Sequence, residues 1–185
     1  MAEFAISGQT AASQLASGGR SLFSASGFTL RELAQVPKLR IQTVRGRSGA
    51  LPRVLPETPN TLSGTDPWIL WRAPGDWMAY SITMPYPALT QTIAEDAPDC
   101  VLTDVSSGIV LLELSGQRTV DILMRDCTLD LDGGEIGIGR CAQTVLAQVN
   151  VLLHPCGTGP AWRLFVERSV AVHLWDWLVD TAEGG

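Results

Sequence analysis

The sequence predicts an α+β fold, in which strands and helices follow one another irregularly along a single domain within 185 residues. Apolar residues at every second position indicate strands, most clearly over residues 38–44 and 162–166. A helical repeat of apolar residues follows residue 116, and another follows residue 169. Because strands and helices do not alternate strictly, we expect a mixed or antiparallel sheet with packed helices rather than a parallel βαβ sheet.

The N-terminal segment, residues 1–27, is rich in Ser, Ala and Gly. This composition predicts a tail that is flexible or that becomes ordered only on a partner, with the folded domain at residues 28–182. At the start of that domain, Thr29 and Glu32 have the spacing of a capping box. That spacing predicts a short helix or turn near residues 30–35.

The next segments indicate a connection and a β-hairpin. Residues 45–64 carry several Gly and Pro residues and are expected to form an irregular connection. Two short runs rich in Trp, at 68–71 and 77–82, flank a Pro-Gly-Asp turn and predict a hairpin. A helix is expected at 87–95, where Leu89 and Ile93 lie one turn apart.

The segment from Leu102 to Gly116 is the most informative part of the chain. It begins with Asp104-Val105-Ser106, which is typical of a turn, and continues into a strand at residues 108–114. That strand is apolar on both faces, so it should be covered on both sides within a sheet. Its two faces comprise Ile109 and Leu111 on one side and Val110, Leu112 and Leu114 on the other.

The C-terminal part predicts a helix, strands and a closing helix. The expected apolar stripe of the first helix comprises Val120, Leu123, Met124 and Cys127. Residues 129–139 form an acidic Gly-rich loop, and residues 145–153 read as one strand. In the closing helix, residues 169–182, Trp175 and Trp177 lie about 200° apart, so both can hardly face one core. One of them is therefore expected to be exposed or covered by a partner.

The composition excludes several classes of function. A net charge of −6 and a pI near 4.8 argue against binding to nucleic acid or to an anionic membrane. No stretch approaches the roughly 20 apolar residues of a membrane span, and the N-terminus lacks the pattern of a secretory signal. We therefore expect a cytoplasmic protein whose four cysteines are reduced, mostly packed thiols.

Candidate chemical sites in the sequence are weak. A Cys3His zinc site is conceivable from one set of residues, but packed thiols and a surface histidine are favoured because only the last two of them are close in sequence. That set comprises Cys127, Cys141, His154 and Cys156. The two histidines, His154 and His173, are interpreted as solvated or capping side chains, and no nucleophile motif accompanies them. The Gly-rich segment 133–139 lacks the spacing of a phosphate-binding loop. We predict no catalytic, cofactor-binding or metal-binding residue in this chain.

Asp104 leaves two alternatives open. Its carboxylate can accept a backbone N–H in an Asx-type turn and brace the chain before the strand. Alternatively, a carboxylate at this position can pair with the amino and ring N–H groups of a pterin. The structural role is favoured from the sequence.

Six segments together resemble the gamma subunit of heterotetrameric sarcosine oxidase, which has the folate-binding fold of the glycine cleavage T-protein. They occur in the family's order over about residues 28–180, and the ordered set is more specific than any one of them. The segments are Thr58-Pro59-Asn60-Thr61, Trp71 to Met78, Asp104 to Gly116, Cys127 to Leu131, Gly139 to Thr144, and Ser169 to Leu178. Two departures are Asp76-Trp77, which lacks an intervening acidic residue, and Thr128, where the family commonly has Pro.

The resemblance implies an accessory, non-catalytic subunit of a flavin-dependent complex that oxidatively demethylates an N-methyl amino acid. It implies that this chain binds no cofactor, and that FAD, FMN, NAD, zinc and tetrahydrofolate are held by other subunits. The alpha subunit is the expected direct partner, with the beta and delta subunits in the same complex. The alternative is a free-standing folate-binding domain that transfers or senses one-carbon units. The chain length argues against this alternative, since the T-protein has further domains that complete its folate site.

Overall fold

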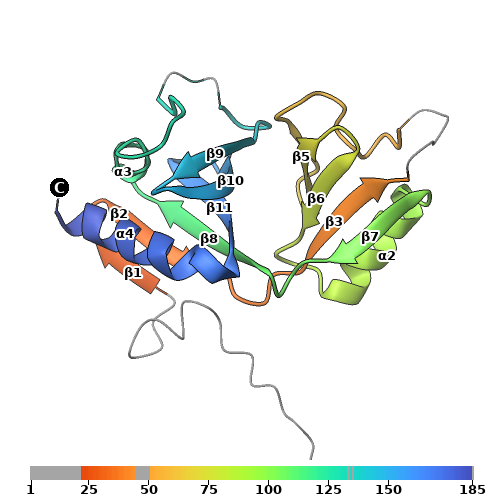
Figure 1. Cartoon of the computed structure of the whole chain (residues 1–185), viewed down its shortest axis with the longest axis horizontal. Coiled ribbons are helices and arrows are strands. Elements are labelled where there is room, and N and C mark those ends of the chain that lie inside the picture. The colour runs from red at the N-terminus through yellow and green to blue at the C-terminus, as the bar shows by residue number, and fades with distance from the viewer. Residues whose placement is uncertain (1–21, 45–50, 133, 135, 185) are drawn as a thin grey trace, which may run out of the picture.

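The structure, a computed structural model, describes residues 22–44, 51–132, 134 and 136–184. Within these residues two antiparallel sheets lie side by side, each with helices on its outer side (Figure 1). The larger sheet has the strand order β1-β2-β8-β11-β10-β9, and the smaller has the order β4-β5-β6-β3-β7. The chain passes between the two sheets after β2 and returns after β7, and these two connections form the junction.

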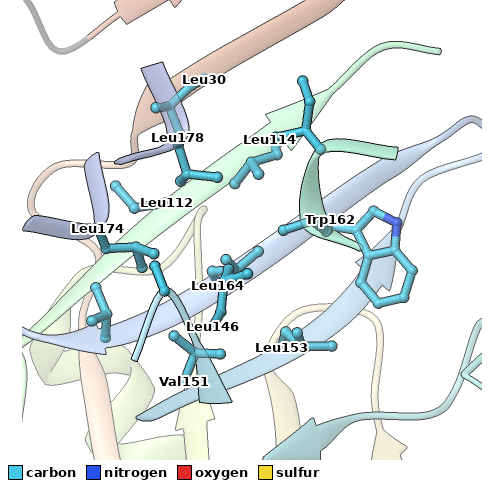
Figure 2. Packing of buried hydrophobic residues seen from close by; sticks show 14 of the residues in the cluster. Leu30, Leu112, Leu114, Leu146, Val151, Leu153, Trp162, Leu164, Leu174 and Leu178 are labelled. Atoms are coloured by element: carbon cyan, nitrogen blue, oxygen red, sulfur yellow. The ribbon is translucent and has the colours of Figure 1, made fainter. Parts of the chain in front are cut away.

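The larger sheet packs against the closing helix. Its strands are β1 (Leu22–Ala25), β2 (Phe28–Glu32), β8 (Ile109–Ser115), β9 (Ala142–Leu146), β10 (Val149–Cys156) and β11 (Ala161–Glu167). The helical segments beside it are α3 (Thr119–Leu123), the 3-10 turn η1 (Arg168–Val170) and α4 (Ala171–Glu183). Figure 2 shows Leu174 and Leu178 of α4 directed toward Leu112 of β8, and all three side chains are buried. Each such burial contributes about 1.5–3 kcal/mol to stability.

The smaller sheet has its own core. Its strands are β3 (Lys38–Thr43), β4 (Leu62–Ser63), β5 (Trp68–Ala73), β6 (Asp76–Tyr80) and β7 (Cys100–Asp104), and α2 (Tyr86–Asp96) covers one face. Leu89 and Ile93 of α2 are fully buried against this sheet, as their one-turn spacing predicts. A third cluster joins the sheets, with Met78 of the smaller sheet packed among Leu111 and Phe165 of the larger one. Strand β8 therefore buries both faces, which confirms the prediction for residues 108–114.

Two predictions in the N-terminal part are wrong. The Thr29–Glu32 segment is part of strand β2 rather than a helix, because Phe28, Leu30 and Glu32 point alternately inward and β2 pairs with β8. The ordered sheet also begins before the predicted boundary at residue 28, since β1 starts at Leu22 and pairs with β2. The remainder of the predicted tail, residues 1–21, lies outside the described residues.

Predictions in the C-terminal half also need correction. Residues 145–153 are not one strand but parts of β9 and β10, which turn back at Ala147 and Gln148, both with positive φ. The helix α3 ends before Met124, whose side chain is 43% exposed, so the predicted stripe does not continue. In the Gly-rich segment 133–139, residues 133 and 135 lie outside the described residues.

The inference that Trp175 and Trp177 cannot share a core is wrong. Trp175 is 7% exposed and Trp177 is partly buried against the same cluster. Helix α4 contacts α3 as well as β1 of the larger sheet, so its buried face is wider than a single stripe. The predicted partner contact at these tryptophans is therefore not needed to explain their burial.

Candidate functional site

The Asp104-Val105-Ser106 turn lies at the junction, between the end of β7 and the start of β8. The Asp104 Oδ1 atom accepts a hydrogen bond from the Ser106 backbone N–H at 2.8 Å. The Gly108 N–H donates to Val105 O at 3.1 Å and closes the turn. This is the Asx-type brace predicted for Asp104. The carboxylate is otherwise exposed, so the brace does not exclude a ligand contact.

Ser106 connects this turn to the first residue of β3. Its Oγ accepts a hydrogen bond from the Lys38 N–H at 2.9 Å and lies 3.3 Å from Lys38 O, to which it donates. The Val105 N–H also donates to Lys38 O, at 3.0 Å. The two connections between the sheets are therefore bonded to each other at Lys38, and Asp104 orients the serine that makes the bond.

Lys38 is itself unusual. The sequence contains one lysine and twelve arginines, and this lysine is only 3% exposed. Its Nζ donates to Val36 O at 2.8 Å. Burial lowers the pKa of the amine to about 8, an effect that Glu32 and Asp104 partly oppose and Arg168 reinforces. Sequence reasoning passed over Lys38, although its being the only lysine was a visible signal.

Arg168 closes the site from the larger sheet. It follows β11, and its backbone N–H donates to Gly108 O at 2.9 Å. Its Nε donates to Ser107 O at 2.5 Å. The guanidinium is thus fixed over the turn that Asp104 braces.

Two cavities flank this junction and share Asp104, Ser107, Ile109 and Arg168 in their walls. The larger, about 1120 Å³, opens between the two sheets, with an apolar floor that includes Phe165. The smaller, about 320 Å³, lies on the other side and contains Lys38 in its wall. Its other polar wall groups are Glu32, Gln35, Tyr86 and Ser106. Both volumes fall near the range of small-molecule sites.

A cluster of polar side chains, which the sequence does not predict, joins the two sheets through their interior. This buried polar group comprises Tyr80, His154, Arg163 and Glu113. Tyr80 Oη lies 2.8 Å from His154 Nε2 and accepts a hydrogen bond from Arg163 Nη1 at 2.9 Å. Arg163 Nε donates to Glu113 Oε2 at 3.1 Å, and the guanidinium stacks over Trp68 at 4.6 Å. The interpretation of His154 as a surface histidine is wrong, because its side chain is 1% exposed.

The direction of the hydrogen bonds made by His154 can be assigned. His154 Nδ1 lies 2.9 Å from Pro155 O, which can only accept, so Nδ1 carries the proton and Nε2 accepts from Tyr80. Burial lowers the pKa of His154 to about 4, which keeps the ring neutral as this assignment requires. Burial also raises the pKa of Tyr80 well above its usual value, so its hydroxyl stays protonated. The result is a stabilising contact rather than an acid–base pair poised near pH 7.

The residues considered for a zinc site do not come together, because each contacts a different part of the chain. Cys141 Sγ contacts Thr61 O at 3.3 Å and Trp71 O at 3.6 Å, whereas His154 faces Tyr80. All four cysteines are free thiols, one buried and three partly buried, as predicted. In the described part of the chain, no cluster of three or more His, Cys, Asp or Glu residues could hold a metal ion. His173 is exposed and its Nε2 lies 2.9 Å from Ala147 O, so it caps the β9–β10 turn.

Comparison with known proteins identifies the family. The model of the sarcosine oxidase gamma subunit family matches residues 49–184. The chain belongs to this family. The sarcosine oxidase gamma subunit of Corynebacterium sp. (strain U-96) is 31% identical over 165 residues, which cover 82% of this chain and 78% of the relative. The corresponding subunit of Corynebacterium sp. (strain P-1) is 28% identical over 173 residues, covering 85% of this chain and 81% of that one.

Solved structures confirm the predicted fold. A chain of heterotetrameric sarcosine oxidase from Corynebacterium sp. U-96, in complex with pyrrole 2-carboxylate, matches with a TM-score of 0.79 and 27% identity. The match covers 95% of this chain and 94% of that chain. The glycine cleavage system aminomethyltransferase T of Bartonella henselae matches with a TM-score of 0.57 and 14% identity, over 83% of this chain and 45% of that one. The gamma subunit fold is thus an α+β fold of the T-protein type.

None of the helices in the described part of this gamma-family chain is both long and apolar enough to cross a membrane.

The junction is built mainly from backbone contacts made by Ser106, Val105 and Arg168. It places the amine of Lys38 and the guanidinium of Arg168 beside the two cavities. It can hold two sheets at a fixed angle, and its side chains can contact a small polar molecule.

Proposed function

We propose that this chain is the accessory gamma subunit of a heterotetrameric, flavin-dependent oxidase that removes a methyl group from an N-methyl amino acid. The observation that carries the proposal is the match along 95% of this chain to a chain of the heterotetrameric enzyme from Corynebacterium. The sequence similarity to gamma subunits over four-fifths of the chain supports the same role. The alpha subunit is its proposed direct partner, with beta and delta subunits in the same cytoplasmic complex.

The proposal assigns no catalytic residue, cofactor or metal of that oxidation to this chain. FAD, FMN, NAD, zinc and tetrahydrofolate are proposed to be held by the other subunits. The chemistry of the buried polar group supports this division, since His154 and Tyr80 have pKa values displaced away from neutrality and are bonded to each other. Exposed apolar side chains are available for a subunit contact, among them Val44, Val101 and Ile138.

A co-purification experiment tests this function. The tagged chain is expressed in its native cell and recovered under mild conditions. We expect it to bring down large flavin-containing subunits whose mixture oxidises an N-methyl amino acid. The same chain purified alone should lack the flavin absorption band at about 450 nm, because the flavin is carried by other subunits. Stoichiometric flavin in the isolated chain, or recovery of the chain without any oxidase subunit, contradicts the proposal.

One observation favours the second candidate, a free-standing folate-binding domain. The exposed carboxylate of Asp104 lines the cavity of about 1120 Å³ between the sheets, where a pterin has room. Titration of the isolated chain with a stable reduced folate distinguishes the two candidates. The accessory role predicts no saturable binding, whereas a folate-binding domain predicts saturable binding that Asp104→Ala abolishes.

A further inference from the structure

Position 38 carries the single lysine of the chain. Twelve of the thirteen basic residues are arginine, and the one lysine is buried rather than solvated. A buried cation with a purely structural role is commonly arginine, which makes more hydrogen bonds and always stays charged. Lysine differs in that its amine can lose a proton and then acts as a nucleophile.

The second observation is the rigid placement of this amine. The backbone of Lys38 is held by Ser106 on both its N–H and its carbonyl, and the Nζ atom is held by Val36 O at 2.8 Å. An amine that donates one hydrogen to a carbonyl keeps its lone pair available when it is neutral. The cavity of about 320 Å³ is lined by Lys38, so a compound of a few heavy atoms fits beside it.

The third observation is the set of charges around the cavity. Glu32 of β2 and Asp104 of β7 contribute carboxylates, Arg168 of η1 contributes a guanidinium, and Tyr86 of α2 contributes a hydroxyl. A guanidinium offers five donors in a planar fork, of which Nε is used by Ser107 O. Such a fork suits a carboxylate, which it can bind with two parallel hydrogen bonds.

We propose that Lys38 is a carbonyl-reactive amine, which takes a small aldehyde carrying a carboxylate and holds that carboxylate on Arg168. The inference concerns a site of this chain alone and does not depend on the role proposed for the oxidase complex. It extends to the Asp104-Val105-Ser106 turn, which fixes Lys38 in place.

The reaction needs no further reactant. The Nζ lone pair forms a bond to the aldehyde carbon, and the carbonyl π electrons move to oxygen. One proton moves from nitrogen to that oxygen and gives a carbinolamine. Loss of the hydroxyl group and of a second nitrogen proton, together as water, then gives an imine. Glu32 lines the same cavity, and we assign to it the transfer of these protons.

The protonation state favours reaction in the folded chain. With a pKa near 8, roughly a tenth of the amine is neutral at pH 7. An ordinary lysine, with a pKa of about 10.4, has less than 0.1% of its amine in that form. Folding should therefore accelerate the reaction of Lys38, whereas burial without function should slow it.

The experiment uses the full chain, glyoxylate as the probe and cyanoborohydride to reduce the imine to a stable carboxymethyl adduct. Peptide mass spectrometry measures the adduct at Lys38 in the native chain and in the chain unfolded in guanidinium chloride, both at pH 7. We expect the native rate to be at least about tenfold higher than the unfolded rate, since the fraction of neutral amine is about two-hundredfold higher in the native chain. The native rate should level off above pH 8, whereas the unfolded rate should continue to rise. A native rate at or below the unfolded rate overturns the proposal.

Variants of Arg168 test the carboxylate. Arg168→Gln removes a charge that lowers the pKa of Lys38, so it should slow both reactions to some extent. The loss of rate should be at least about fivefold greater with glyoxylate than with acetaldehyde, which has no carboxylate. Arg125→Gln, on an exposed arginine away from the cavity, is the matched control and should change neither rate. Equal losses with both aldehydes in Arg168→Gln overturn the assignment of the ligand class. The Lys38→Arg variant should yield no adduct at this position.

Discussion

Removing one hydroxyl group from the interior tests whether the buried polar group holds the two sheets together. The substitution is Tyr80→Phe. It keeps the ring that stacks on Trp68 and meets Phe165 edge-on, with centroid distances of 4.9 Å in both cases. It removes the bonds to His154 Nε2 and Arg163 Nη1, each shorter than 3 Å. Any loss of stability is therefore attributable to hydrogen bonds rather than to a cavity.

The expected loss follows from the partners left behind. Two bonds are removed, and a buried nitrogen that loses its partner costs about 1–3 kcal/mol. His154 is 1% exposed and Arg163 is 7% exposed, so water cannot readily replace the hydroxyl. We expect the free energy of unfolding to fall by about 2–4 kcal/mol, which corresponds to roughly 4–16 °C in Tm for a chain of this size.

Urea unfolding of the two tyrosine variants measures this loss. Tyr86, the other tyrosine of the chain, is 39% exposed, so Tyr86→Phe is a matched control that should change stability by less than about 0.5 kcal/mol. A double variant with His154→Leu should lose less than the sum of the single variants, because one bond is counted twice. If Tyr80→Phe unfolds with the same free energy as Tyr86→Phe, the buried group does not stabilise the contact between the sheets.

Three further predictions concern the core, the histidine and the turn. Leu112→Ala should destabilise by about 2–5 kcal/mol, and the more exposed Val145→Ala by less than about 0.5 kcal/mol, both by urea unfolding. His154 is neutral when folded, with a pKa near 4, so stability should be complete above pH 6.5 and fall by up to about 3 kcal/mol as pH drops to 4. His154→Leu should remove that slope and His173→Gln should keep it. Asp104→Ala should lose about 1–2 kcal/mol while Asp104→Asn, which retains the Oδ1 acceptor, loses less; equal losses would mean that the charge matters rather than the turn.

Sequence patterns predict a helix or strand correctly where pairing with a distant strand does not oppose the local preference. The hairpin of β5 and β6, the helix α2 and the doubly buried strand β8 follow from periodicity and turn chemistry. The capping-box spacing of Thr29 and Glu32 predicts a helix that does not form, because a cap contributes only about 1 kcal/mol. Burial of Phe28 and Leu30 against β8 outweighs it.

The turn between β9 and β10 was missed for a different reason. Two-residue hairpin turns with positive φ normally carry Asn or Gly, whereas here Ala147 and Gln148 adopt φ of 51° and 63°. His173 Nε2 lies within hydrogen-bonding distance of Ala147 O, and this contact comes from a helix distant in sequence. A single sequence gives no sign of such support, so the apolar alternation predicts one continuous strand over residues 145–153.

The site was less predictable than the fold because its groups come from separate elements. The alternation along β10 places Val151 and Leu153 toward the core of the larger sheet, and this was visible in the sequence. The sequence does not show what covers the opposite face, so it predicts a solvated His154, whereas Tyr80 of the smaller sheet covers this side chain. The Asx brace at Asp104 was predictable because it is local, whereas its consequence for Lys38 depends on a contact between residues 68 positions apart.

These contacts explain why an Asp-Val-Ser turn is valuable in a subunit to which we assign no step of the oxidation. The two sheets have separate cores, and a subunit surface that spans both sheets keeps its shape only if their relative angle is fixed. Ser106 fixes the angle at the edge, where the two connections cross, and Tyr80 fixes it in the interior. Loss of either should loosen the surface without unfolding either core, so we expect variants of Ser106 and Tyr80 to weaken subunit assembly more than variants of equal stability within the core around Leu112.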